Sequence, residues 1–173
     1  MTNKLVLVGY MGAGKSTVAK ILAKSLQLEW LDLDDLIVLK EKSTITDIFK
    51  TKGEIYFRRL EHQIFSDLIA SQNQSFVLST GGGTPCYANN HLLLNATDVT
   101  SVYLKASLEH LVKRIIPSKA KRPLMVHLKD DEIADFVAKH LFERSFFYHQ
   151  AKFVVSTDEK SPTGVARQIM DLL

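Results

Sequence analysis

The amino-acid sequence predicts an α/β fold in three layers, in which a central parallel sheet of about five strands lies between two layers of helices. Short apolar runs, typical of buried strands, alternate along the chain with longer stretches in which apolar residues recur every three to four positions. Such alternation implies a parallel sheet that is covered on both faces. The chain has 173 residues, of which 46% are hydrophobic, so we expect a single domain, residues 1–173, with its own core.

Each expected element corresponds to one of these segments. The predicted strands are residues 4–8, 29–32, 75–79, 99–104 and 152–155, and the predicted helices are residues 14–26, 53–71, 107–115, 131–149 and 161–172. Thr44, followed three residues later by Asp47, predicts a further short helix with a capped start.

Residues 115–131, "IIPSKAKRPLMVHLKDD", interrupt this pattern. They contain two prolines and several basic residues between two predicted helices, and their apolar residues follow neither period for long. Loops of this length in a compact domain are often functional lids. We therefore expect a mobile basic flap here, with a lid at residues 115–128.

Composition argues against several classes of partner. The net charge is +3, from 22 basic and 19 acidic side chains, and no window clusters five or six basic residues, so we expect no nucleic-acid partner. Cys86 is the only cysteine, which predicts no intrachain disulfide and a reducing compartment. The apolar run before Gly9 is too short for the core of a signal peptide, and no apolar stretch is long enough for a membrane span. These features predict a cytoplasmic protein without a membrane partner.

The segment "GYMGAGKS", residues 9–16, predicts a phosphate-binding loop. Gly9, Gly14, Lys15 and Ser16 match the pattern G-x-x-x-x-G-K-[ST] between a predicted strand and a predicted helix. In such a loop backbone N–H groups surround the phosphates, the lysine reaches their outer oxygens and the hydroxyl ligates Mg²⁺. An accidental glycine turn is the alternative, but residue frequencies give this pattern in under about one chain in a hundred of this length.

Other motifs narrow the class of nucleotide-binding protein. The chain has no N-K-x-D motif of the kind that reads the base in GTPases. It also has no run of four apolar residues ending in Asp-Glu, which argues against a motor or AAA-type ATPase. A small kinase remains, and its phosphate acceptor must be inferred from the rest of the sequence.

The segment "LDLDD", residues 31–35, follows the second predicted strand. Because side chains alternate along a strand, Asp32 and Asp34 are expected to point to the same side, toward the phosphate loop. One carboxylate would be useful near Mg²⁺, and the other could accept a proton from an attacking hydroxyl. The alternative is an acidic turn that begins a helix at Leu36, and for Asp35 this is the preferred interpretation.

Two further segments suggest where an acceptor could bind. Arg58 and Glu61 are three residues apart on one helical face, with Glu54 four residues before the arginine. They could form a surface ion pair, or an arginine held by a glutamate could offer its guanidinium to a substrate carboxylate, and periodicity does not separate these possibilities. Residues 81–83 are three consecutive glycines after a strand, which would either expose backbone N–H groups to a ligand or form a flexible turn.

Together these segments resemble the shikimate kinase family. The resemblance is carried by the G-x-x-G-x-G-K-[ST] loop, D-x-D at Asp32 and Asp34, F-R-x-x-E at Phe57, Arg58 and Glu61, G-G-G at 81–83, R-P-L at 122–124, and Arg144 followed by Tyr148. The motifs occur in the family's order with similar spacing, from Lys4 to the C-terminal helix. Each motif except the first is weak alone, but the set is specific.

The resemblance implies a role for each matching residue. Lys15, Asp34 and Arg122 would be catalytic, with Arg122 closing over the transferring phosphoryl group. Contacts to ATP would come from Gly12, Ala13, Gly14, Lys15, Ser16, Thr17, Arg114, Arg122 and Pro162. The substrate would be bound by Asp34, Arg58, Gly81, Gly82 and Arg144. Ser16 and Asp32 would hold Mg²⁺. Pro162 also has a purely structural explanation, because proline is favoured at the first position of a helix.

The implied activity is Mg²⁺-dependent transfer of the ATP γ-phosphoryl group to the 3-hydroxyl of shikimate, in the chorismate route to aromatic amino acids. The fold would be that of P-loop nucleoside-monophosphate kinases, with a substrate-binding segment at residues 33–61, and we expect a monomer. A gluconate-type kinase of the same fold and a nucleotide-binding regulator that has lost catalysis are the alternatives. Four residues remain unassigned: Cys86, His62, Lys119 and Lys121.

Overall fold

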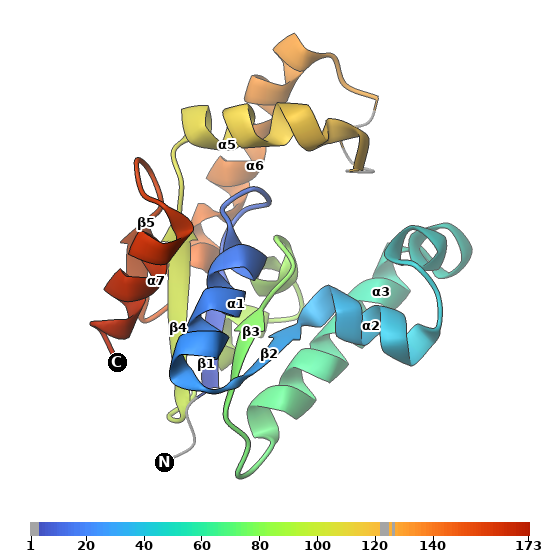
Figure 1. The fold of residues 1–173 in the computed structure, drawn as a ribbon. Coiled ribbons are helices and arrows are strands. Elements are labelled where there is room, and N and C mark those ends of the chain that lie inside the picture. The colour runs from blue at the N-terminus through green and yellow to red at the C-terminus, as the bar shows by residue number, and fades with distance from the viewer. Residues whose placement is uncertain (1–3, 122–124, 126) are drawn as a thin grey trace.

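In a computed structural model of the chain, which describes residues 4–121, 125 and 127–173, five strands form one parallel sheet (Figure 1). The strands are β1 (Lys4–Val8), β2 (Glu29–Asp32), β3 (Phe76–Ser79), β4 (Val99–Lys105) and β5 (Phe153–Ser156). Their order across the sheet is β2-β3-β1-β4-β5, and every neighbouring pair is parallel. The predicted sheet is therefore confirmed, with each strand within a residue of its expected bounds.

Helices account for most of the remaining chain. They are α1 (Lys15–Leu26), α2 (Leu33–Glu41), α3 (Ile45–Ala70), α4 (Asn90–Leu93), α5 (Leu108–Ile115), α6 (Asp130–Tyr148) and α7 (Pro162–Met170), with short 3₁₀ turns η1 (Thr84–Cys86) and η2 (Ile116–Lys121). Two predictions need correction. The helix expected to begin at Leu36 begins three residues earlier, because the Asp32 side chain caps it. The helices expected after Thr44 and at 53–71 form one element, α3, which is interrupted at Gly53 by a non-helical backbone (φ 81°, ψ 170°).

Capping side chains explain where several helices begin. The Thr44 hydroxyl accepts a hydrogen bond from the Asp47 amide at 3.1 Å, as the sequence predicts. Ser161 accepts one in the same way from the Gly164 amide at 3.1 Å, and Pro162 follows it at the first helical position of α7. These caps satisfy amide groups that the first turn of a helix leaves without partners.

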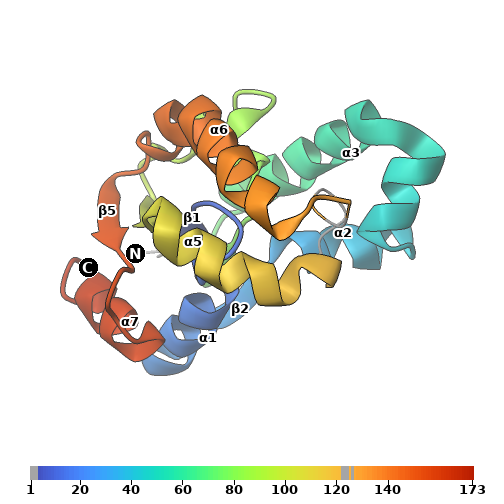
Figure 2. The same ribbon diagram turned by 90° about the horizontal axis from the view of Figure 1, so that it is seen from above.

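The helices cover both faces of the sheet. Figure 2 shows α1 and α7 on one face and α3 and α6 on the other, while α2 and the first part of α3 extend beyond the β2 edge. Central strand β1 is bonded on both sides, and its five residues, including Lys4, are buried. Because all strands are parallel, their carboxyl ends share one edge, and loops 9–14 and 80–83 and the start of α2 meet there.

The expected flap is partly ordered secondary structure. Helix α5 continues directly into η2, and the Lys119 ammonium group donates to the Leu128 carbonyl at 3.0 Å and to the Asp130 carboxylate at 2.5 Å. Lys119 therefore has a structural role in joining η2 to the start of α6. Arg122 and the other residues of the R-P-L motif lie outside the described residues, and so does the side chain of Lys121. Among the helices that the structure describes, none is long and apolar enough to cross a membrane.

A pair of glycine substitutions tests the close contact beneath the loop that follows β1. Gly9 has φ +146°, and a Cβ there would lie 2.7 Å from the Leu104 carbonyl oxygen, so Gly9→Ala is expected to lower the free energy of unfolding by more than about 1 kcal/mol. Gly164 in α7 has ordinary space around it, so Gly164→Ala is expected to leave stability unchanged or raise it by up to about 1 kcal/mol. Urea unfolding measures both, and equal effects would contradict the assigned contact.

Candidate active site

The loop between β1 and α1 has the geometry of an anion-binding site. Gly14, the N-cap of α1, has a left-handed conformation and offers no side-chain cap, and no acidic residue lies in the first turn. The amide groups of that turn therefore stay available to an anion, which the helix dipole also favours. Lys15 is buried, and its ammonium group donates to the carbonyls of Gly9 at 2.8 Å and Tyr10 at 3.0 Å. The loop thus wraps around its own lysine.

The Asp32 carboxylate joins this loop to two neighbouring elements. One oxygen accepts hydrogen bonds from the hydroxyls of Ser16 at 3.0 Å and Ser79 at 2.6 Å. The other accepts the amide of Asp34 at 3.1 Å, which makes Asp32 the N-cap of α2. Asp34 therefore lies in the first turn of a helix, and strand alternation is not what brings the two carboxylates to the same edge.

Asp34 is a carboxyl group that titrates well above its ordinary range. Burial, followed by the charges of Asp32 and Glu61, raises its pKa to about 6, while Lys15 and Arg58 oppose the shift. Gly81 lies against it, since a Cβ on that glycine would be 3.3 Å from the Asp34 carboxylate. A group of this kind exchanges a proton near neutral pH, which suits general base chemistry.

Arg58 is held in the site by a buried glutamate. Glu61, whose side chain is 1% exposed, accepts a hydrogen bond from the Arg58 guanidinium at 2.8 Å and another from the Thr84 hydroxyl at 2.7 Å. The guanidinium also lies 4.0 Å from the Tyr87 ring and directly over Gly83, where a Cβ would come within 2.9 Å of it. Glu54 is the weaker partner, at 3.5 Å and exposed. The arginine and Glu61 are therefore no surface ion pair, which settles the first ambiguity left by the sequence.

A second guanidinium, that of Arg144, lies beside the phosphate loop. Arg144 lies on α6 with its guanidinium 5.6 Å from the centre of the Tyr10 ring. Burial raises the pKa of the Cys86 thiol to about 11, but the charges of Arg144 and Arg58 both act to lower it. The charges of two arginines that are far apart in sequence therefore act on one half-buried thiol, which follows the glycine loop. Burial thus favours the protonated thiol of Cys86 at neutral pH.

The glycine loop after β3 packs directly on the phosphate loop. A Cβ on Gly82 would lie 3.2 Å from the Met11 amide nitrogen, closer than most such contacts, so a larger residue would press on the phosphate loop. The Gly82 carbonyl accepts a hydrogen bond from the Tyr148 hydroxyl of α6 at 2.5 Å. These contacts hold the loop between β1 and α6, which resolves the alternative of a flexible turn.

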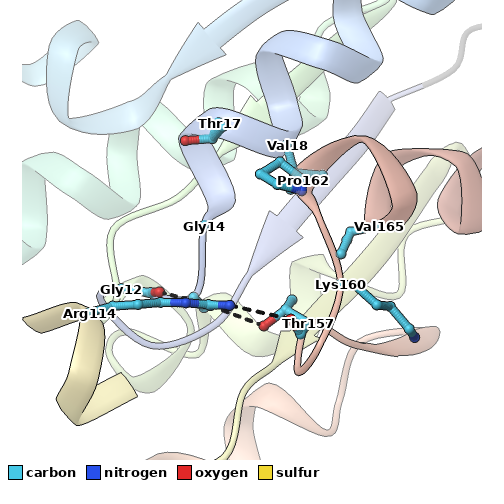
Figure 3. Close-up of a pocket in the computed structure, with 10 residues that line it drawn as sticks. Gly12, Gly14, Thr17, Val18, Arg114, Thr157, Lys160, Pro162 and Val165 are labelled. Carbon is cyan, nitrogen blue, oxygen red and sulfur yellow. Dashed lines mark hydrogen bonds between the residues drawn. The ribbon is translucent and has the colours of Figure 1, made fainter. Parts of the chain in front are cut away.

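A cavity of about 220 Å³ adjoins the phosphate loop (Figure 3). It is lined by Gly12, Ala13, Gly14, Thr17, Val18, Arg114, Thr157, Lys160, Pro162 and Val165. The Arg114 guanidinium donates to the Gly12 carbonyl and to the hydroxyl and carbonyl of Thr157, each at 3.3 Å, which fixes its plane. In Figure 3, Arg114 from α5 and Pro162 from α7 reach the cavity from different elements. A planar ring could be held between them.

Sequence reasoning missed several residues of the site. Thr84, which bonds to Glu61, and Thr157, which fixes Arg114, have no motif of their own. Thr157 follows β5 directly, so the shared edge of parallel strands is the signal that could have found it. His62 lies beside Arg58 in a cavity on the outer side of α3, and its ring bonds to Asn90 at 2.7 Å.

Comparisons with known proteins show the family and the fold of this chain. The family model described as "Shikimate kinase" matches residues 11–173. The chain is 49% identical to a shikimate kinase of Flavobacterium psychrophilum and 48% identical to one of Flavobacterium johnsoniae, over 99% of each chain in both cases. Among solved structures it is similar to a shikimate kinase of Bacteroides thetaiotaomicron (TM-score 0.88, 32% identity, 98% and 97% of the two chains). It is also similar to one of Acinetobacter baumannii in complex with shikimate (TM-score 0.87, 32% identity, 99% and 93%).

The raised pKa of Asp34 predicts a pH-dependent effect on stability. In the folded chain the group ionises near pH 6, whereas an unfolded chain ionises it near pH 3.9, so stability is lost as the pH rises between these values. Asp34→Asn should therefore raise the free energy of unfolding at pH 8, by on the order of 1–3 kcal/mol, and the gain should shrink as the pH falls from 6 toward 4. Urea unfolding at several pH values measures this. The exposed neighbour substitution Asp35→Asn is the control, and a gain that does not depend on pH would contradict the assignment.

Proposed function

The chain belongs to the shikimate kinase family, and we propose that it transfers the γ-phosphoryl group of ATP to the 3-hydroxyl of shikimate, giving shikimate 3-phosphate and ADP. The observation that carries this proposal is that the glycine loop lies against Arg58, Asp34 and the phosphate loop at once. Arg144 lies beside the Tyr10 ring of that same phosphate loop. Shikimate is an anion with several hydroxyl groups, so its binding needs arginines for the carboxylate and an acidic group for a hydroxyl. The solved relative in complex with shikimate supports the same acceptor.

On the acceptor side, Arg58 and Arg144 would bind the shikimate carboxylate. A guanidinium presents parallel N–H donors that match a carboxylate, and both groups are already oriented before the substrate arrives. The amides of Gly81 and Gly82 would add backbone contacts, because no side chain separates them from a ligand. This clamp fixes the ring so that one hydroxyl faces the phosphate loop.

Asp34 would bind that hydroxyl and take its proton. The hydroxyl oxygen forms the new bond to the γ-phosphorus, the bond from that phosphorus to the bridging oxygen of ADP breaks, and the proton passes to the Asp34 carboxylate. Its pKa of about 6 leaves it ionised at neutral pH, yet basic enough to receive a proton. Holding donor and acceptor in line supplies much of the rate in such transfers.

On the donor side, the phosphates of ATP would lie in the loop at residues 12–17, with Lys15 released from its carbonyl partners to the outer phosphate oxygens. Arg114 and Pro162 would enclose the adenine in the cavity of Figure 3. Arg122, outside the described residues, is proposed to close over the phosphoryl group. Lys15 and Arg122 would bring positive charge to the phosphoryl oxygens, where negative charge develops, and would stabilise the transition state.

Ser16 and Asp32 would hold Mg²⁺. Both present oxygen atoms, the ligands that Mg²⁺ prefers, and their 3.0 Å hydrogen bond places a hydroxyl and a carboxylate together at the end of the phosphate loop. When bound, the ion would neutralise phosphate charge. A single carboxylate suffices at such sites because the nucleotide phosphates supply further oxygen ligands.

Two segments are proposed to move with substrate binding. Residues 33–61 would be the substrate-binding segment, and residues 115–128 would be the lid. The break in α3 at Gly53 supports the first, since it separates residues 45–52 from the part of the helix that carries Arg58. We further propose a cytoplasmic monomer that acts on ATP and shikimate without a nucleic-acid partner.

Steady-state kinetics with shikimate, gluconate and MgATP test the proposed function. We expect ADP release that depends on shikimate and not on gluconate. Gluconate dependence would favour a gluconate-type kinase, and no dependence on either acid would favour a regulator that has lost catalysis.

Arg58→Ala tests the acceptor clamp within the same assay. Because one partner of a buried charge pair is removed, kcat/KM for shikimate should fall by about 30-fold or more, while KM for ATP changes little. Arg59→Ala removes an exposed arginine next to it and is the control. Unchanged shikimate kinetics in Arg58→Ala, or an equal loss in the control, would contradict the assignment.

The pH dependence of kcat/KM for shikimate tests Asp34 as the base. The rate should rise with pH through about 6, because only the ionised carboxylate can accept the proton of the hydroxyl. Asp34→Asn should remove this limb together with most of the activity. A wild-type profile that is flat between pH 5 and pH 8 would exclude the role.

A further inference from the structure

Tyr10 has an aromatic side chain in the middle of the phosphate loop, where phosphate binding itself requires only backbone groups. The side chain is 1% exposed, so its ring is part of the interior of the site. Its carbonyl oxygen accepts hydrogen bonds from the Ala13 amide at 3.1 Å and from the Lys15 ammonium at 3.0 Å. The backbone of Tyr10 therefore helps to hold the loop and its lysine.

The side chain of Tyr10 contacts helix α6 instead. Its hydroxyl lies 3.2 Å from Nδ1 of His140, and the two rings meet edge to face with centroids 6.3 Å apart. One turn further along α6, the Arg144 guanidinium lies 5.6 Å from the centre of the Tyr10 ring, within the range of a cation–π interaction. Phe136 also packs on the His140 ring, with centroids 4.2 Å apart. Burial and the Arg144 charge lower the pKa of His140, so the neutral ring is available to accept the tyrosine hydroxyl.

The two arginines of the clamp are oriented by different means. Arg58 is bonded to the Glu61 carboxylate, whereas Arg144 forms no ion pair with a carboxylate in the part of the chain that the structure describes. Its described neighbours include the Tyr10 ring, the Tyr148 hydroxyl and the Cys86 thiol. A ring fixes a guanidinium while leaving its N–H donors for a ligand, which a carboxylate partner would compete for.

We propose that Tyr10 is a positioning residue, which orients Arg144 toward the acceptor carboxylate through its ring and is itself held to α6 by His140. This inference rests on the proposed function. It makes the phosphate loop part of the acceptor site. The Tyr10 carbonyl holds Lys15 on the ATP side, and the Tyr10 ring supports Arg144 on the acceptor side.

Kinetics of Tyr10→Leu and Tyr10→Phe test the proposal. Tyr10→Leu removes the ring and should raise KM for shikimate about 3- to 30-fold, while KM for ATP stays within about twofold. Tyr10→Phe keeps the ring and should recover most of this loss. If Tyr10→Leu does not fold, as judged by urea unfolding, Tyr10→Met takes its place, with the same expected shift.

The methyl ester of shikimate shows whether the effect acts through the carboxylate. The ester lacks the charge that Arg144 would bind. The value of kcat/KM for the ester should therefore be the same in Tyr10→Leu as in the unaltered chain. A fall as large as that seen with shikimate would overturn the proposal.

Phe136→Leu is the matched control for general packing of α6, since Phe136 contacts the His140 ring but has no described contact with Arg144. An equal rise of shikimate KM in this control, or an equal rise of ATP KM in Tyr10→Leu, would also overturn the proposal. If instead the unaltered chain shows no shikimate-dependent release of ADP, the proposed function fails, and this result is distinct from the others.

Discussion

The site depends on the carboxylate of Asp32. This one group receives the hydroxyl at the start of α1, the hydroxyl at the end of β3 and the amide that begins α2. Three segments that are far apart in the sequence therefore converge at one point of the sheet's edge. Because Asp32 caps α2, that helix begins immediately at the end of β2, and Asp34 lies in its first turn, close to the phosphate loop. Phosphate loop and acidic group are placed together by a hydrogen-bond network and not by strand geometry alone.

Each charged group of the site has a defined partner or is available to a ligand. Glu61 is buried and binds Arg58 and Thr84, so it orients an arginine without meeting solvent. Burial, together with the charges of Asp32 and Glu61, keeps the pKa of Asp34 above that of an ordinary aspartate. Removing water from such a cluster strengthens every interaction inside it, which is why ordered partners matter more here than on the surface.

The parallel sheet and the succession of strands and helices along the chain could be predicted from sequence, because apolar runs and helical periods report burial directly. The start of α2 could not, since the capping role of Asp32 depends on serines brought to it by other elements. Periodicity likewise placed Arg58 and Glu61 on one helical face but could not decide whether that face was buried. The contact of Tyr10 with α6 joins residues 130 positions apart, and no local pattern encodes it. The family resemblance proposed which residues share a site, whereas the structure supplies the hydrogen bonds that orient them.

Cys86 illustrates what burial does to a reactive atom. Two guanidinium groups would ordinarily favour a thiolate, yet desolvation outweighs them and holds the pKa at about 11, so roughly one thiol in ten thousand is ionised at pH 7. The thiolate is the form that attacks oxidants and alkylating reagents, so this sulfur is expected to react slowly although two guanidinium charges act on it. The cleft can therefore contain a cysteine without becoming sensitive to the redox state of its surroundings.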